Sequence, residues 1–246
     1  MEKFGVFKYG NILDGEIRRE LRDAFNLESI IYYGFWDILS NNKNGFGVQI
    51  WPDGTIYEGL LANDMQNGVG RLIHSSGDVY YGEWYNNMAH GKGDYLHCDG
   101  STYKGQWKFD RQDGYGIECW SDGTYYEGEF KEGKKHGKGK CKWINGSEYE
   151  GNFSDNQLEG YGIYKWKTGK EYRWQWKKNQ MNGKGEFIWP ESRKYEGMFV
   201  NDKKEGYGII TWSYNKGMMG GNFPENLKII KSTAKVNILI EMEILF

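Results

Sequence analysis

Eight Gly-x-Gly tripeptides recur along this chain at a constant spacing of 23 residues. The series begins with Gly45 and Gly47 and ends with Gly206 and Gly208, and no residue is inserted or deleted between its members. A fixed period of this length indicates one supersecondary unit that is copied end to end. A residue type that is present eight times in equivalent places builds the architecture, so these glycines are poor candidates for catalysis.

Most repeats also contain a tyrosine, followed two residues later by a glycine and four residues later by a large apolar side chain, as in Tyr80, Gly82 and Trp84. A period of two places these three side chains on one face of a β-strand. The Gly-x-Gly segment begins a second strand, which reaches a Trp or His four residues after its second glycine. By the same alternation, both glycines of a pair and this Trp are expected to share a face. The pattern therefore predicts one β-hairpin per 23 residues.

Two kinds of connection join these strands. Segments such as Pro52-Asp53-Gly54 are typical of a tight hairpin turn whose glycine has a positive φ. The other connection, for example from Lys131 to His136, is expected to be a polar loop of about six residues. Glycine normally weakens a strand, and we expect each one here to lie against an aromatic ring of the adjacent strand.

The expected organisation is an all-β array of about eight repeats plus a final half repeat over residues 32–223. Residues 1–31 lie outside the period, and Asp14 could cap a short helix over roughly 15–26 that covers the first strand edge. Residues 224–246 form a tail that ends in an apolar run from Val236 to Phe246. This run either closes the last edge strand or docks on a partner, and the sequence leaves both alternatives open.

Composition narrows the class of protein. The formal net charge is −2, so no global field attracts nucleic acid. The three cysteines (Cys98, Cys119 and Cys141) are odd in number, which predicts no disulfide framework and a reducing cytosolic setting. The segment after Met1 is polar, and no apolar run approaches the ~18–20 residues of a membrane helix. We therefore expect a cytoplasmic protein without a transmembrane segment.

The motifs of catalysis and cofactor binding are not found. No glycine pair extends to Gly-x-Gly-x-x-Gly, and no Walker lysine–serine pair follows one. His74 and His97 occupy equivalent positions, but residues two strands apart are roughly 10 Å distant, which is too far for a shared zinc ion. No nucleophile, histidine and acid can be singled out as a set. The sequence predicts a protein that is not an enzyme and holds no metal or cofactor.

The aromatic columns are the candidate partner-binding residues: Trp84, Trp107, Trp120, Trp143, Trp166, Trp174, Trp176 and Trp189. Most of them could equally serve internal packing. Trp174 replaces the glycine of other repeats, which indicates either local repacking or a protruding contact residue. A weaker rhythm of 46 residues alternates Gly-Lys-Gly with Gly-Tyr-Gly, so alternate repeats present different surfaces that could set the register of binding.

Lysines gather in two loops on one predicted edge of the array. The candidates for contact with anions are Lys131, Lys134, Lys135, Lys177 and Lys178. They could meet anionic lipid headgroups or acidic protein tails, or they could form a solvated edge.

The segment Tyr-Tyr-Glu-Gly-Glu-Phe-Lys-Glu-Gly-Lys-Lys-His-Gly-Lys-Gly at 125–139 closely resembles the MORN repeat, the "membrane occupation and recognition nexus". The resemblance extends over residues 32–223. It implies an elongated, twisted antiparallel ribbon of successive hairpins with an aromatic groove. The family includes radial-spoke head proteins, other ciliary components and modules historically linked to phospholipids.

The resemblance leads to two hypotheses. The first is a non-enzymatic scaffold that contacts other proteins of a cytoskeletal or ciliary assembly, in the axoneme, radial spoke or basal apparatus. The alternative is a peripheral membrane module that binds anionic phospholipids through its lysine-rich loops.

Overall fold

The computed structural model describes residues 19–27, 30–213, 226–232 and 238–241. The chain divides into two compact units, Met1–Ser121 and Asp122–Phe246, and each is described by itself. The regular structure in the described ranges consists of strands, without a helix. The predicted all-β class with antiparallel strands is therefore confirmed.

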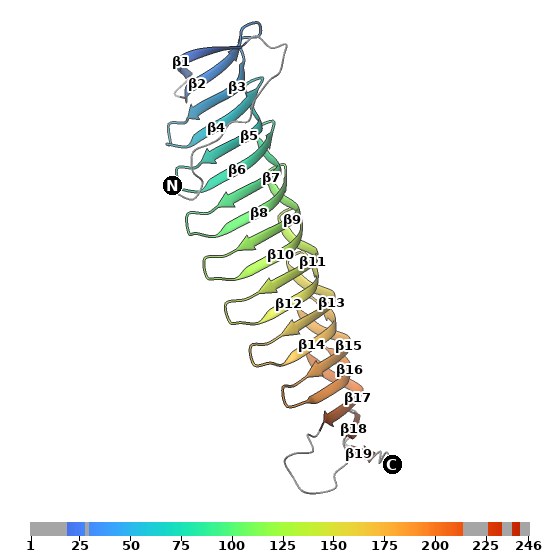
Figure 1. The fold of residues 1–246 in the computed structure, drawn as a ribbon. Coiled ribbons are helices and arrows are strands. Elements are labelled where there is room, and N and C mark those ends of the chain that lie inside the picture. Colours follow the sequence, from blue (N-terminus) through green and yellow to red (C-terminus); the bar gives the residue numbers. More distant parts are fainter. Residues whose placement is uncertain (1–18, 28–29, 214–225, 233–237, 242–246) are drawn as a thin grey trace. The chain divides into compact units, whose positions relative to one another are not determined.

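The first unit is a sheet in which each strand pairs antiparallel with the next one along the chain (Figure 1). Its strands are β1 (Arg19–Leu27), β2 (Ile30–Asp37), β3 (Lys43–Ile50), β4 (Ile56–Ala62), β5 (Met65–Ile73), β6 (Val79–Tyr85), β7 (Met88–Leu96), β8 (Thr102–Lys108) and β9 (Arg111–Cys119).

The second unit repeats this sequential antiparallel pairing. Its strands are β10 (Tyr125–Lys131), β11 (Lys134–Lys142), β12 (Glu148–Ser154), β13 (Gln157–Lys165), β14 (Glu171–Lys177), β15 (Gln180–Ile188), β16 (Arg193–Val200), β17 (Lys203–Ser213), β18 (Asn226–Ser232) and β19 (Ile238–Glu241).

The two kinds of connection differ from the prediction in their lengths. Trp51–Thr55 joins β3 to β4 as a five-residue loop, and its Gly54 has the predicted positive φ of 88°. The loop predicted over Lys131–His136 is wrong, because β10 ends at Lys131, β11 begins at Lys134 and only Glu132-Gly133 connects them. Both residues of this turn have positive φ, as a two-residue hairpin turn requires. Asn, Asp and Gly tolerate that backbone conformation, so the polar residues mark a tight turn.

One face of each sheet carries the buried tyrosines, and we call it the tyrosine face. In β4 the residues Tyr57, Gly59 and Leu61 are buried and alternate with half-buried neighbours, which confirms the predicted shared face. The Tyr57 hydroxyl donates a hydrogen bond to the carbonyl oxygen of Leu60 at 2.7 Å. The same bond to the residue three positions on is made by Tyr32, Tyr80, Tyr103, Tyr126, Tyr149 and Tyr172.

The two glycines of a pair have different roles. A Cβ built on Gly70, the second of its pair, would lie 2.6 Å from Cε2 of Tyr57, so the tyrosine ring covers this glycine as expected. The first glycine, Gly68, has a φ of 92°, and its Cβ would meet Leu60 on the opposite face. The strand is bulged between these points, because Gly59 pairs with Gly70 while Leu61 pairs with Gln66. The prediction that both glycines share the tyrosine face is therefore wrong for the first.

Of the tight turns that the structure describes, six fasten their hairpins to the preceding one. Asp64 accepts a hydrogen bond from the backbone N–H of Lys43 at 2.8 Å, and its own N–H donates to the Lys43 carbonyl at 3.1 Å. Equivalent side-chain oxygens bond the N–H group 21 residues earlier in the pairs Asn87–Gln66, Asp110–Ala89, Asn156–Lys135, Asn179–Leu158 and Asp202–Met181.

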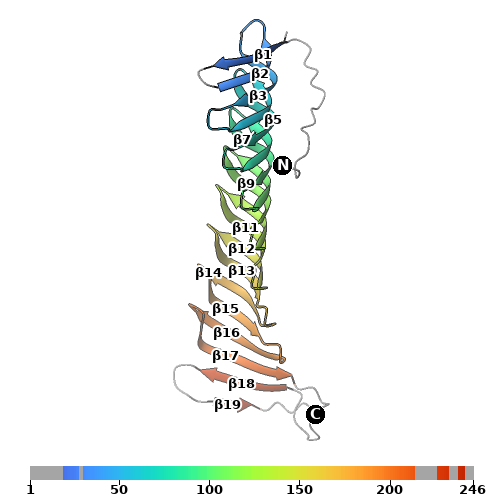
Figure 2. The ribbon, with the colours of Figure 1, turned by 90° about the vertical axis from the view of Figure 1, so that its left-hand side faces the viewer.

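The two ends of the chain continue as strands where they are described. The helix predicted over roughly 15–26 is wrong from residue 19 onwards, because β1 pairs with β2 as a strand; Asp14 and residues 15–18 lie outside the described residues. At the other end β18 pairs with β17 and β19 pairs with β18, so the three lie side by side (Figure 2). Part of the predicted tail thus extends the sheet, while residues 233–237 and 242–246 lie outside the described ranges.

Candidate functional site

The tyrosine face of the second unit contains a groove with a volume of about 480 Å³. Three buried side chains, Phe153, Leu158 and Trp176, form its floor. The Trp176 indole N–H donates to the carbonyl oxygen of Gly162 at 3.2 Å, and its ring meets Tyr172 edge to face at 5.1 Å between centroids. This packing fixes the floor in one position.

Half-buried aromatic rings form one wall of the groove. Trp143 stacks on Tyr164 with ring centroids 5.3 Å apart, and Tyr164 lies 4.6 Å from Trp166. The series continues to Phe187 and Trp189 at 5.4 and 4.5 Å. Each ring leaves part of its surface exposed, so the wall can accept further apolar contacts.

Polar groups form the rim. Lys135, Asn156, Asn179 and Asp202 line the groove where the hairpins turn. The two asparagines and Asp202 are positioned by the turn-to-backbone bonds already described, and the Lys135 ammonium lies 5.2 Å from the ring centroid of Tyr126. The rim is therefore held in place by the fold.

An apolar floor, an aromatic wall and a polar rim are the features of a surface that buries side chains of another molecule. Trp and Tyr are also the residues that most often carry binding energy in such surfaces. Burial raises the pKa of Tyr149 and Tyr172 above the usual value for a phenol. No cluster of metal-binding side chains occurs in the described part of the chain. The arrangement suits recognition of apolar groups.

The structure divides the predicted tryptophans into groups. Trp143, Trp166 and Trp176 meet in the groove, and Trp189 extends its wall beside the Arg193 guanidinium at 4.0 Å. The remaining three on this face belong to the first unit: half-buried Trp107 and Trp120, and buried Trp84. Trp84 and Trp107 donate to the carbonyls of Gly70 and Gly93, so their indoles are anchored in the sheet like that of Trp176.

Trp174 lies on the opposite face from the groove, where sequence alternation did not place it. Its φ of 111° turns the side chain away from the tyrosine face. The Lys184 ammonium lies 5.0 Å from the centroid of the Trp174 ring. Gly185 is covered by the Tyr172 ring on the tyrosine face, so the preceding residue, Lys184, points to the opposite face together with Trp174. At the equivalent Gly151 a Cβ would lie 2.5 Å from the Tyr149 hydroxyl, so a ring has no room on that side.

The predicted lysines lie at the tight-turn ends of two hairpins. Lys131 ends β10, Lys134 and Lys135 begin β11, Lys177 ends β14 and Lys178 is in the turn after it. Acidic groups lie among them: the Lys134 ammonium is 3.4 Å from an Asp155 oxygen, and the backbone N–H of Lys178 donates to the Glu159 carboxylate at 3.0 Å. Only Lys135 of this set lines the groove.

Leu158, Tyr164 and Met181 also line the groove, but the sequence pattern did not single them out as candidates. Tyr164 lies two residues before Trp166, so strand alternation places it on the same face. Leu158 and Met181 share one position, 23 residues apart, just after a tight turn. This 23-residue recurrence of an apolar side chain after the turn is the sequence pattern that could have identified them.

Comparison with known proteins gives a family and no near relative. The MORN repeat model matches residues 39–56, 57–79, 80–102, 103–125, 126–148, 149–171, 175–192 and 195–213. No curated protein was found to be similar in sequence. Among solved structures, the TCP domain of SAS-4 in complex with a proline-rich motif of Ana2 from Drosophila melanogaster is 13% identical, with a TM-score of 0.39, over 79% of this chain and 99% of that one. A catalytically inactive virginiamycin B lyase from Staphylococcus aureus is 15% identical, with a TM-score of 0.17, over 91% of this chain and 74% of that one. Scores this low support no conclusion about function.

Proposed function

The chain belongs to the MORN-repeat family, and from this premise we propose that it is a non-enzymatic scaffold that binds a segment of another protein in the groove of its second unit. MORN repeats are typically modules that contact proteins or membrane lipids, and their proteins are generally not enzymes. The observation that carries the proposal is the groove itself, in which half-buried Trp143, Tyr164 and Trp166 stand beside a buried floor.

The proposed assembly is cytoskeletal. Because the MORN family includes radial-spoke head proteins and other ciliary components, we propose a component of the ciliary axoneme, radial spoke or basal apparatus, located in the cytoplasm. Within such an assembly the groove would hold one partner segment.

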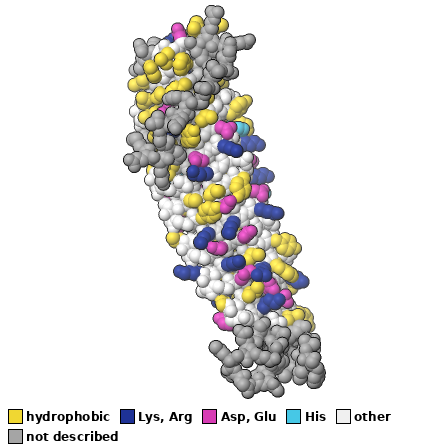
Figure 3. Space-filling view, viewed as in Figure 1, with side chains coloured by type: hydrophobic (Ala, Val, Ile, Leu, Met, Phe, Trp, Pro, Cys, Tyr) yellow, Lys and Arg dark blue, Asp and Glu magenta, His cyan; other side chains and the backbone are white. Residues whose placement is uncertain are grey.

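Binding of anionic phospholipid is the less favoured alternative. A membrane-binding surface gains about 1 kcal/mol for each unpaired basic group near the lipid. The predicted lysines have acidic neighbours such as Asp155 and Glu159, and on the face turned to the viewer in Figure 3 basic and acidic side chains are interspersed. No helix in the described ranges is long and apolar enough to cross a membrane.

The test compares one change in the wall of the groove with one change outside the groove. Trp166→Ala removes a wall ring, whereas Ile144→Ala removes an apolar side chain that is 69% exposed beside Trp143 but does not line the groove. Proximity labelling in cells would identify partners, and calorimetry with each purified partner would measure affinity. We expect Trp166→Ala to weaken binding by about tenfold or more and Ile144→Ala to leave it unchanged.

Equal affinities of both variants for every recovered partner would contradict the proposal. Flotation with vesicles containing anionic lipid tests the alternative: binding that is lost on charge reversal of Lys177 and Lys178 would favour lipid, and no binding would exclude it.

A further inference from the structure

The face opposite the groove carries a row of alternating basic and aromatic side chains. Lys138, Tyr161, Lys184 and Tyr207 are the middle residues of the Gly-x-Gly segments in β11, β13, β15 and β17. The residue after each of them belongs to one continuous line of paired residues from Gly139 to Gly208. The four therefore occupy equivalent points two strands apart, at intervals of about 9.6 Å.

The aromatic members of this row are strongly exposed. Tyr161 is 63% exposed and Tyr207 is 75% exposed. Between them, Trp174 adds an indole that is 39% exposed, held there by its φ of 111°. A residue other than glycine with a φ in this positive range costs of order 1–3 kcal/mol of backbone strain, and such strain is concentrated at functional sites, including binding sites. Trp174, Lys184, Tyr207 and Ile209 line a groove of about 440 Å³.

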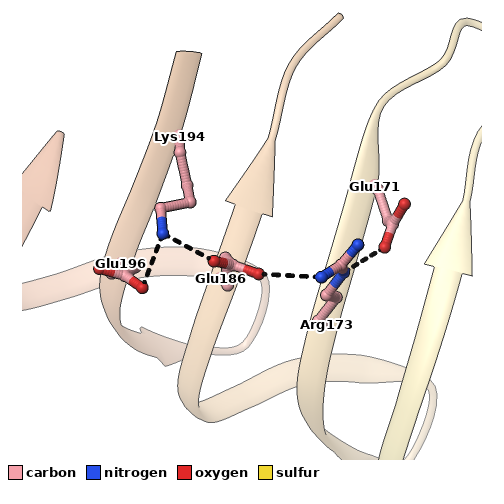
Figure 4. A network of polar contacts seen from close by, with 5 residues as sticks. All are labelled: Glu171, Arg173, Glu186, Lys194 and Glu196. Atoms are coloured by element: carbon pink, nitrogen blue, oxygen red, sulfur yellow. Dashed lines mark hydrogen bonds and ion pairs between the residues drawn. The ribbon is translucent and has the colours of Figure 1, made fainter. Parts of the chain in front are cut away.

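The acidic groups around Trp174 and Lys184 are already engaged. Glu171 pairs with Arg173, which lies 3.7 Å from Glu186, and Lys194 lies 3.0 Å from both Glu186 and Glu196 (Figure 4). The hydrogen bonds that the Lys194 ammonium donates to Glu186 and Glu196 raise the pKa of Lys194.

The ammonium groups of the row's lysines have no such partners, although the Lys138 backbone N–H donates to the Glu129 carboxylate at 3.1 Å. Among the described residues neither Lys138 nor Lys184 makes an ion pair, and the Lys184 ammonium is placed over the Trp174 ring. Two unpaired cations thus alternate with two exposed aromatic rings, and this pattern is complementary to a chain whose acidic and apolar side chains alternate.

We propose that the row Lys138–Tyr161–Lys184–Tyr207 docks an acidic segment of a partner protein in the polyproline II conformation. Its acidic side chains would meet the two lysines, and apolar side chains three residues away would pack on Tyr161, Trp174 and Tyr207.

The spacing selects this conformation. Polyproline II has three residues per turn and a rise of 3.1 Å per residue, so every third side chain recurs on one side after about 9.3 Å. Over the three intervals of the row the mismatch is about 1 Å. An α-helix presents the same face again after seven residues, a rise of about 10.5 Å. Its mismatch with the row would therefore reach nearly 3 Å over the same three intervals. In a β-strand, side chains three residues apart point to opposite faces, so they could not all meet the row.

The experiment uses the full chain and a fluorescent peptide, Glu-Pro-Pro-Leu-Pro-Pro-Glu-Pro-Pro-Leu, in anisotropy titrations. The control peptide has lysine in place of glutamate. We expect the acidic peptide to bind and the basic peptide not to bind. Lys184→Glu and Tyr207→Ala should each weaken binding by about tenfold. The matched control, Lys167→Glu, changes an exposed lysine in a turn outside the row and should leave the affinity unchanged.

Several outcomes would overturn the proposal. One is that the acidic peptide does not bind at about 1 mM. Another is that Lys184→Glu and Lys167→Glu have equal affinities for this peptide. A third is that a helical peptide with glutamate and leucine seven residues apart binds more tightly. Loss of peptide binding in Trp166→Ala would instead assign the peptide to the groove on the tyrosine face. Thermal unfolding of each variant excludes loss of fold as the cause.

Discussion

The ring of Tyr103 covers Gly116 on the neighbouring strand so closely that a Cβ at Gly116 would lie 2.5 Å from the tyrosine hydroxyl oxygen. That hydroxyl is held by its bond to the Gln106 carbonyl at 2.9 Å, and the ring is buried. Gly116→Ala should therefore lower the free energy of unfolding by about 3 kcal/mol, because neither ring nor strand can move aside. Denaturant unfolding measures the change.

Gly100→Ala is the matched control for this substitution. Gly100 has a φ of 91°, but no atom lies within 4 Å of its added Cβ. Only backbone strain is introduced, so a loss of about 1 kcal/mol is expected. Equal losses for the two variants would mean that the tyrosine ring does not require the glycine.

The bond between the Asn179 side chain and the Leu158 N–H should stabilise the second unit. Asn179→Ala leaves this N–H without its acceptor, and we expect a loss of about 1–2 kcal/mol. Hydrogen exchange at the Leu158 amide should accelerate in parallel. Gln180→Ala changes the exposed next residue and should leave exchange at Leu158 as it was; acceleration in both variants would refute the role of the bond.

Trp174 and Trp176 should respond in opposite directions. Trp174→Gly restores the glycine of other repeats and removes strained backbone, so the melting temperature should rise by a few degrees. Trp176→Ala empties a buried position and should cost about 3–5 kcal/mol. A lower melting temperature for Trp174→Gly would show that its ring supports the fold.

The buried tyrosines should make the fold sensitive to alkali. Burial raises the pKa of Tyr57, Tyr80 and Tyr103 above the usual value, and that of Tyr95 to about 12. Above pH 10 the unfolded chain loses phenolic protons that the folded chain keeps. Stability is therefore complete below pH 10 and falls as the pH rises further, by up to about 1.4 kcal/mol per pH unit for each such tyrosine.

Tyrosinate absorbance and circular dichroism, recorded together, test this dependence. The buried tyrosines should ionise only as the sheet unfolds. Ionisation of every tyrosine near pH 10 with an unchanged dichroism spectrum would contradict it.

Side-chain alternation predicted most of the fold, because Tyr57, Gly59 and Leu61 must share a face once they lie on a strand. It failed where the backbone departs from regular pairing. A positive φ reverses the direction of the Trp174 side chain and of a Cβ built on Gly68, and residue spacing does not record φ. The Glu132-Gly133 turn was predicted as a loop because polar composition alone does not separate the two. The residues around 19–26 follow a helical pattern, but in the sheet they pair with β2.

Only part of the candidate site could be predicted from the sequence, because packing, like φ, is not recorded in residue spacing. The positions of Trp143 and Trp166 follow from the repeat, whereas the contribution of Leu158, just after a tight turn, depends on packing that residue spacing does not record. Tryptophans at equivalent positions also differ in exposure, and only packing shows which ones leave a ring accessible.

Site-specific photo-crosslinking in cells tests the central claim, that a partner protein binds in the groove, most directly. A benzophenone amino acid would replace Trp166 in one variant and Ile144, outside the groove, in the other. We expect a single protein to crosslink through position 166 and little or no product to form through position 144. Equal crosslinking at both positions, or none at position 166, would contradict it.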